Sequence, residues 1–198
     1  EEFKLARSLD LGDLIGVDGE LKYTKTGELT IMLGGDTPAC DAARDVLRHL
    51  GNTILATGAL GSGHAMKALN NLVSAGGFLI AAEALRVGQE FGLDGDTIVD
   101  VLNASTGMNN STRLKLRQHV LSGKYASGFA LDLMVKDLGI ATGLADDLQL
   151  DVPFSRLCQR IWAEGARMLG PGADHTALAR TVATPELSAA LGAKEGGQ

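Results

Sequence analysis

Hydrophobic positions along the chain predict one long helix at residues 62–91. The segment follows a glycine-rich turn at 58–63, and it is apolar nearly all round, with an unbroken apolar run at 75–82. A helix with this pattern is normally buried within a domain or between subunits. We therefore expect the rest of the chain to be organised around it.

Further helices are predicted towards the C-terminus. Apolar residues spaced three and four apart indicate a helix over 131–148, and Pro153 and Gly170 bound another at 154–169. Shorter helices are expected at 97–103 and 113–121. The small, polar sequence at 183–198 is typical of a disordered tail.

The N-terminal part has a different pattern. Apolar runs at 13–23 and 29–33 flank a turn signal and predict a β-hairpin. A helix at 37–50 and a short strand at 53–56 then follow, and together they form a β-α-β unit. We thus expect three parts: a hairpin and β-α-β unit (1–57), a helical domain (58–182) and the tail.

Composition excludes several kinds of partner. The chain has 198 residues and a net charge of −6. It has no basic cluster of the kind that nucleic-acid binders need. Its longest apolar run is far shorter than the roughly 20 residues that cross a bilayer. Two distant cysteines suggest neither a disulfide framework nor a thiolate metal site. We expect a cytoplasmic protein without nucleic-acid or membrane partners.

Polar residues gather on one face of the long helix. His64, Lys67, Asn71 and Ser74 follow one another at spacings of three, four and three, which place them on the same side. A lysine near the start of a buried helix is costly unless it has a partner or a task. This face is the first candidate for chemistry.

Three motifs extend this interpretation. They are Gly-Glu-Leu-Thr-Ile-Met-Leu-Gly-Gly at 27–35, the glycine turn leading to Lys67 and Asn71, and Phe-x-Leu-x-Leu-Met-x-Lys-Asp-Leu-Gly at 129–139. In this order they resemble the β-hydroxyacid dehydrogenases, the 3-hydroxyisobutyrate dehydrogenase family, over residues 27–182. The resemblance implies a mainly α fold. It would be a 6-phosphogluconate-dehydrogenase-like C-terminal helical domain with one long central helix, and it would form a homodimer.

The resemblance also implies roles for four residues. In this family, the lysine that matches Lys67 transfers a proton at the substrate oxygen, and the amide that matches Asn71 holds the substrate. Lys136 matches a residue that closes over the NAD(P) cleft, and Asp137 supports it. The resemblance therefore predicts catalytic residues on the long helix and cofactor contacts near 136–137.

A second resemblance covers the N-terminal segment. Residues 10–30 are similar to part of the OB-fold of class II lysyl-tRNA synthetases, although only about one hairpin of that five-stranded barrel is present. The two resemblances overlap at the pentapeptide 26–30. We infer a mosaic, natural or laboratory-made, that is joined there, and we expect no tRNA-binding role.

A complete dehydrogenase of this family begins with a strand, a GxGxxG turn and a helix that hold the dinucleotide. No such unit precedes residue 27. We therefore expect a truncated, dehydrogenase-derived helical domain that does not turn over NAD(P) by itself.

Two alternatives remain open. The chain can be a metal-dependent hydrolase of activated esters or phosphoesters, with zinc held by His64 and Asp137 or by Asp45 and His49. It can also be a dehydrogenase fragment that is completed in trans by a nucleotide-binding domain.

Overall fold

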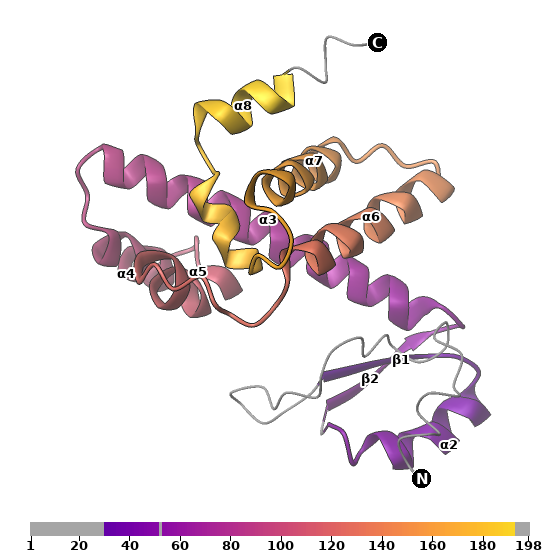
Figure 1. Cartoon of the computed structure of the whole chain (residues 1–198). Helices are drawn as coiled ribbons and strands as arrows, with labels where there is room; N and C mark the ends of the chain where they lie inside the picture. Colours follow the sequence, from indigo (N-terminus) through magenta and orange to yellow (C-terminus); the bar gives the residue numbers. More distant parts are fainter. Residues whose placement is uncertain (1–29, 52, 193–198) are drawn as a thin grey trace. The chain divides into compact units, whose positions relative to one another are not determined.

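The computed structural model describes residues 30–51 and 53–192 (Figure 1). The chain divides into two compact units, one ending at Asn70 and the other beginning at Asn71. The division falls inside helix α3 (Ser62–Glu90). The predicted strand at 13–23 and the synthetase-like segment lie outside the described residues.

The first unit contains the predicted β-α-β arrangement. Strand β1 (Thr30–Gly34) pairs in parallel with β2 (Thr53–Gly58), and helix α2 (Thr37–Leu47) connects them. Alternation along β1 buries Ile31 and Leu33 against Leu47 of the helix. This apolar contact is the reason why the crossover folds back on the strands.

Helix α2 ends three residues earlier than the predicted end at residue 50. Asp36 caps its start, accepting a hydrogen bond from the Ala39 amide at 2.8 Å. At the other end the backbone tightens, because the amides of His49 and Leu50 donate to carbonyls only three residues back. Residues 48–50 therefore form a turn and not a last helical turn.

Helix α3 begins very close to β1. A Cβ atom added to Gly63 would lie 2.6 Å from the carbonyl oxygen of Met32, a distance that real Cβ atoms do not adopt. Glycine at this position allows the first turn of the helix to approach the strand backbone. The glycine-rich turn before Lys67 thus has a packing role.

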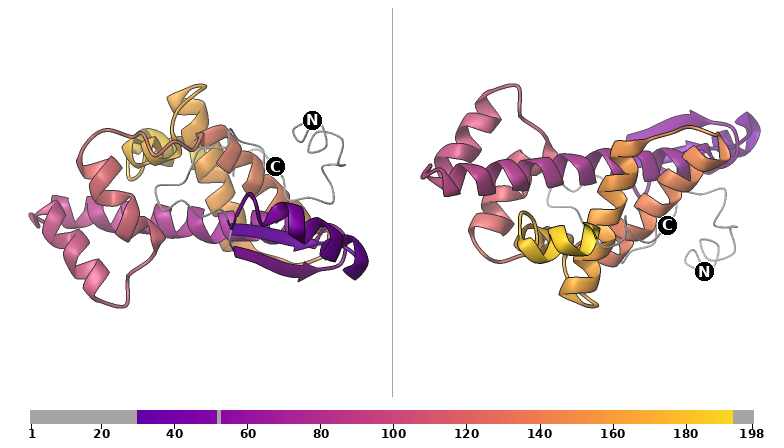
Figure 2. Two further views of the ribbon diagram at one scale, coloured as in Figure 1. Left: turned by 90° about the horizontal axis from the view of Figure 1, so that it is seen from below. Right: turned by 90° about the horizontal axis from the view of Figure 1, so that it is seen from above.

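The second unit is helical apart from one isolated β-bridge among the described residues. After α3 its helices are α4 (Gly95–Ala104), α5 (Asn110–Leu114), η1 (Leu116–Leu121), α6 (Leu131–Asp147), α7 (Pro153–Leu169), η2 (His175–Arg180) and α8 (Pro185–Gly192). Helices α6 and α7 lie side by side (Figure 2). The prediction of a mainly helical chain with a small β-α-β unit is confirmed.

The core of this unit is built around Trp162. This side chain is completely buried and its ring lies 5.8 Å from that of Phe78 on α3. Leu138 of α6 and Leu178 of η2 are equally inaccessible and belong to the same cluster. The three-four spacing that predicted α6 is the spacing of its core residues Leu131, Met134 and Leu138.

The helix predicted at 113–121 is divided in two. Asn109 starts α5 with a reciprocal capping box to Thr112, and the helix ends at Lys115. The chain continues as the π-helical segment η1. The pattern of apolar residues does not distinguish one continuous helix from two short helical segments separated at Lys115.

The tail prediction is wrong for the residues that the structure describes. Residues 185–192 form helix α8, and Leu187 is buried in the Trp162 cluster. Leu187 and the partly buried Leu191 both pack against the core and order a segment whose small residues predict disorder. Residues 193–198 lie outside the described part.

Among the described residues, α3 is long and apolar enough to cross a membrane, with a mean hydropathy of 1.3 over its best window. This is weak evidence for a span, since the core helix of a globular protein meets the same criterion. Here Ala75, Phe78, Leu79 and Ala82 of α3 are buried against α6 and α7.

Candidate functional site

The predicted polar face of α3 makes a short contact with α6. The side-chain amide nitrogen of Asn71 donates to Oδ2 of Asp137 at 2.6 Å. Asp137 comes from the second turn of α6, 66 residues further along the chain. Packing of the two helices around the Trp162 cluster brings the two residues together.

Asp137 is a buried carboxylate with a cation beside it. Only 2% of the residue is exposed. The ammonium nitrogen of Lys136 lies 3.7 Å from Oδ1, and the Lys136 side chain is about half exposed. A buried carboxylate is tolerated when donors and a counter-charge surround it. The structure therefore brings Asn71, Lys136 and Asp137 into one polar cluster.

Lys67 and His64 precede Asn71 on the same helix by about one and two turns. Both belong to the first unit. The Nδ1 atom of His64 is buried and has no hydrogen-bond partner among the described residues. The proton-transfer role of Lys67 and the metal-ligand role of His64 stay predictions.

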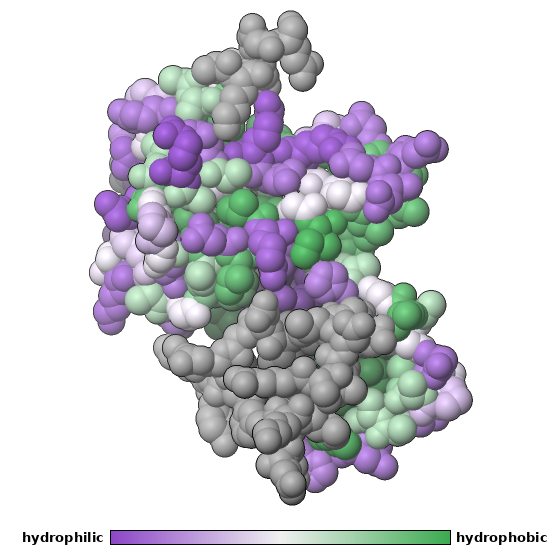
Figure 3. All heavy atoms as spheres, turned by 45° about the vertical axis from the view of Figure 1, so that its right-hand side comes forward, coloured by the Kyte–Doolittle hydropathy of each residue, from purple (hydrophilic) through white to green (hydrophobic). Residues whose placement is uncertain are grey.

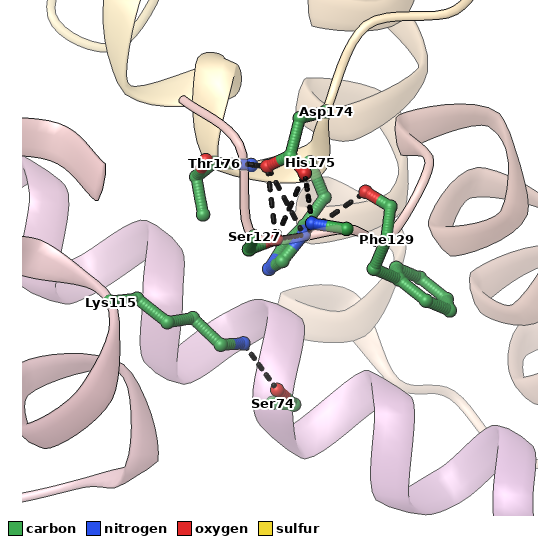
Figure 4. A network of polar contacts seen from close by, with 8 residues as sticks. Ser74, Lys115, Ser127, Phe129, Asp174, His175 and Thr176 are labelled. Atoms are coloured by element: carbon green, nitrogen blue, oxygen red, sulfur yellow. Dashed lines mark hydrogen bonds and ion pairs between the residues drawn. The ribbon is translucent and has the colours of Figure 1, made fainter. Parts of the chain in front are cut away.

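One turn beyond Asn71, a second lysine meets the same face of α3. The Lys115 ammonium donates to the Ser74 hydroxyl at 3.3 Å (Figure 4). Burial lowers the pKa of Lys115, and the negative charge of Asp174 acts in the opposite direction. The sequence pattern identified Ser74 but not Lys115, which lies 41 residues away at the end of α5.

Next to Lys115 lies a hydrogen-bonded network around His175. Its Nδ1 atom is 2.9 Å from the Ser127 hydroxyl, which is also 3.0 Å from the Asp174 carboxylate (Figure 4). Ser127 donates to the carboxylate, so it accepts from Nδ1–H, and Phe129 O lies 3.3 Å from the same nitrogen. Burial and the Lys115 charge lower the pKa of His175 to about 4. The ring is therefore neutral near pH 7.

This network holds two loops together. The Gly128 amide donates to Asp174 at 2.8 Å, and the backbone of 129–131 pairs with that of 173–175. Asp174 also caps η2 through the Thr176 amide. Aspartate is a preferred N-cap residue, so the sequence contained a signal for this cap at Asp174. We interpret the network as a structural clamp.

The contacts at the predicted metal ligands do not support zinc. Because α2 ends at Leu47, Asp45 and His49 are not one turn apart on a helix. Asp45 pairs with Arg48 at 3.2 Å, and His49 Nδ1 lies 3.3 Å from the Val46 carbonyl oxygen. Among residues 30–51 and 53–192, no three His, Cys, Asp or Glu side chains lie together as a metal site.

Comparison with known proteins finds matches that are described as hydroxyacid dehydrogenases. The family model described as NAD-binding of NADP-dependent 3-hydroxyisobutyrate dehydrogenase matches residues 61–182. The 2-(hydroxymethyl)glutarate dehydrogenase of Eubacterium barkeri is 33% identical over 158 residues, which are 80% of this chain and 52% of the relative. The 3-hydroxyisobutyrate dehydrogenase of Pseudomonas aeruginosa is 33% identical over 170 residues, 82% of this chain and 56% of that protein.

A solved structure agrees. The Mycobacterium tuberculosis 3-hydroxyisobutyrate dehydrogenase with L-serine superimposes with a TM-score of 0.70 at 27% identity, covering 78% of this chain and 56% of that chain. The chain thus spans about half the length of the relatives it matches.

These matches correct part of the sequence-based expectation. The sequence predicts a helical domain that lacks the dinucleotide-binding unit, yet the matched segment 61–182 is described as NAD-binding, which conflicts with that prediction in part. The comparisons give no support to a metal-dependent hydrolase, and the mosaic with a synthetase is not shown.

Proposed function

The chain belongs to the 3-hydroxyisobutyrate dehydrogenase family, and from this premise we propose that it is the helical part of an NAD(P)-dependent β-hydroxyacid dehydrogenase. In this proposal α3 supplies the proton-transferring Lys67 and the substrate-holding Asn71. The helical unit corresponds to the 6-phosphogluconate-dehydrogenase-like C-terminal domain. Turnover requires a nucleotide-binding domain, which completes the site in trans or as part of a longer protein.

The hydrogen bond between Asn71 and Asp137 carries the proposal. A carboxylate only accepts, so the 2.6 Å contact directs the Asn71 Nδ2 group towards Asp137. The amide oxygen lies in the same plane on the opposite side of Cγ and points away from Asp137, and in this proposal it accepts a hydrogen bond from a substrate hydroxyl. A charge-assisted contact of this kind fixes the side chain before substrate arrives.

Lys67 would act one turn earlier on the same face. An amine at this place can take the proton of a substrate hydroxyl as the carbon is oxidised, and return it in the reverse direction. NAD(P), when bound, supplies the hydride acceptor. Lys136 fits a contact to this anionic cofactor, since its side chain is half exposed while its ammonium lies 3.7 Å from Asp137.

We also propose that the chain forms a homodimer through α3. Val73, Ile80 and Val87 recur every seven residues on the helix and are 76%, 56% and 66% exposed. Apolar residues are exposed among polar ones elsewhere on the surface (Figure 3). A row of exposed apolar residues on a long helix favours self-association. In sedimentation at micromolar concentration, the unsubstituted chain should be a dimer and the Ile80→Glu variant a folded monomer. If the unsubstituted chain sediments as a monomer, this interface is refuted.

Complementation tests the catalytic proposal. The purified chain would be mixed with the separately produced nucleotide-binding half of the P. aeruginosa relative, and NADH or NADPH formation followed with a panel of β-hydroxyacids. We expect no turnover from either part alone and measurable turnover from the mixture. Lys67→Met should then lower the rate by about 10²- to 10⁴-fold, the usual contribution of a general acid–base group.

Lys124→Met is the matched control, because it removes an exposed lysine elsewhere in the second unit. It should leave the rate of the mixture unchanged. Equal losses in the two variants, or turnover that survives Lys67→Met, would contradict the role of Lys67. A mixture that binds no cofactor and no substrate would contradict the proposed function itself.

A further inference from the structure

A second hollow lies far from Asn71, near the C-terminal end of α3. It has a volume of about 380 Å³ and is lined by α3, η1, η2 and the loops next to them. Arg86 of this lining comes 15 residues after Asn71, which corresponds to about 22 Å along a helix axis. The hollow is therefore separate from the polar cluster around Asp137.

Arg180 is the dominant charge in this hollow. Its guanidinium carbon lies 5.9 Å from the centre of the Tyr125 ring, a cation–π arrangement. No carboxylate in the described part of the chain forms an ion pair with Arg180. Stacking on the ring holds a guanidinium in place while its N–H groups stay available to an acceptor.

The backbone of Tyr125 is unusual. Its φ angle is +43°, a left-handed conformation that a bulky residue rarely adopts. Such strained residues gather at ligand-binding positions, where surrounding structure holds them. Here the strain places the ring beside Arg180 on the wall of the hollow.

The remaining lining combines a second cation with uncharged polar and apolar side chains. Arg86 also faces the hollow, although Glu90 one turn later pairs with it at 2.7 Å. Gln89 and Thr184 add polar groups to the lining. Leu85, Val120 and Val182 form a smaller apolar part, since Leu85 and Val182 are only 2% and 3% exposed. A mixed surface of this kind suits a ligand with one charged end and one apolar end.

We propose that this hollow binds a small organic carboxylate that carries an aliphatic chain. Arg180 pairs with the carboxylate, and Arg86 contributes a second positive charge. The chain of the ligand lies against Leu85, Val120 and Val182. At about 30 Å³ for each water-sized atom, the volume holds about a dozen non-hydrogen atoms. Octanoate is of this size.

The test uses the full chain and three probes of matched chemistry. Isothermal titration and amide NMR shifts would be recorded with octanoate, 1-octanol and acetate, and inorganic phosphate would be a fourth titrant. We expect octanoate to bind more tightly than the other three and to shift the amides of Tyr125, Arg180 and Val182. Arg180→Met should weaken octanoate binding by about ten- to a hundredfold, the loss of one charge-assisted hydrogen-bonded contact.

Arg113→Met is the control, since Arg113 is an exposed arginine of the same unit outside the hollow. Its affinity for octanoate should equal that of the unsubstituted chain. Equal binding of octanol and octanoate would overturn the proposal, as would phosphate binding as tightly as octanoate. The proposal would also be overturned if Arg113→Met lost as much affinity for octanoate as Arg180→Met. The same holds if Arg180→Met changed only the self-association of the chain. Circular dichroism and Trp162 fluorescence verify that each variant is folded.

Discussion

Removal of either partner of the Asn71–Asp137 hydrogen bond should destabilise the second unit, but unequally. Asp137→Ala removes a charge-assisted bond worth about 1.5–3 kcal/mol, and part of this loss is offset because no carboxylate remains to be desolvated. The Asn71 amide is half buried and can reach water. We expect a net cost of about 1–2 kcal/mol in the free energy of unfolding.

Asn71→Ala should cost more than Asp137→Ala. It takes the 2.6 Å donor away from a carboxylate that is only 2% exposed, and it leaves the Lys136 ammonium at 3.7 Å. A buried acceptor that loses its donor typically costs about 1–3 kcal/mol, and more when the acceptor is charged. The coupling energy from the double-mutant cycle should be about 1.5–3 kcal/mol, because each single change removes the same bond.

Urea unfolding monitored by tryptophan fluorescence measures these energies. Trp162 is the chain's single tryptophan and lies fully buried in the core that includes α3 and α6. The pair Arg156–Asp146 is the control, since it has the same 2.6 Å separation at the surface. Its coupling should be much smaller because solvent screens it. A coupling below about 0.5 kcal/mol at Asn71–Asp137 would refute the reasoning.

Three further predictions concern other parts of the structure. Burial raises the pKa of the Cys158 thiol to about 11. In a Cys40→Ser variant, where Cys158 is the remaining thiol, Cys158 should react with a disulfide reagent at pH 8 only after the chain unfolds. Rapid reaction of the folded chain would contradict this prediction. His175 has a pKa of about 4 in the folded chain, against 6.5 in the unfolded chain. Between these two pH values the unfolded chain binds more protons than the folded chain. The free energy of unfolding should therefore fall as the pH is lowered from 6.5 to 4, by at most about 3 kcal/mol. The urea midpoint of His175→Phe should vary less over this range, and an identical pH profile would exclude His175 as the cause. Gly63→Ala would place a Cβ 2.6 Å from the Met32 carbonyl oxygen, so the first unit should lose about 1–3 kcal/mol, measured by hydrogen exchange of the β1 amides; unchanged protection would contradict the close approach.

Helices with a wide apolar face could be predicted from the sequence. Leu131, Met134 and Leu138 of α6 are buried as their spacing indicated. Leu148 was assigned to the same face, yet it follows the end of the helix and is exposed. Periodicity therefore locates the middle of a helix better than its ends, where local capping bonds decide.

Predictions failed where a few long-range contacts outweighed local preference. Helix α8 consists of small residues with weak amphipathic patterning, and the burial of Leu187 orders it. The bend at Lys115 likewise follows no break in the apolar pattern. It places the Lys115 ammonium against Ser74 of α3. Neither contact can be derived from the residues adjacent in sequence.

The polar face of α3 shows the same distinction at the site. Spacing alone put Lys67, Asn71 and Ser74 on one side of the helix, because that arrangement is local. The groups that stabilise this face, Asp137 and Lys115, come from 66 and 41 residues away. The family resemblance identified Asp137, whereas no sequence signal identified Lys115. Lys67, Asn71 and Ser74 are half buried, and Asn71 and Ser74 are held by partners distant in sequence. These partners, and not the row itself, determine what chemistry this face supports.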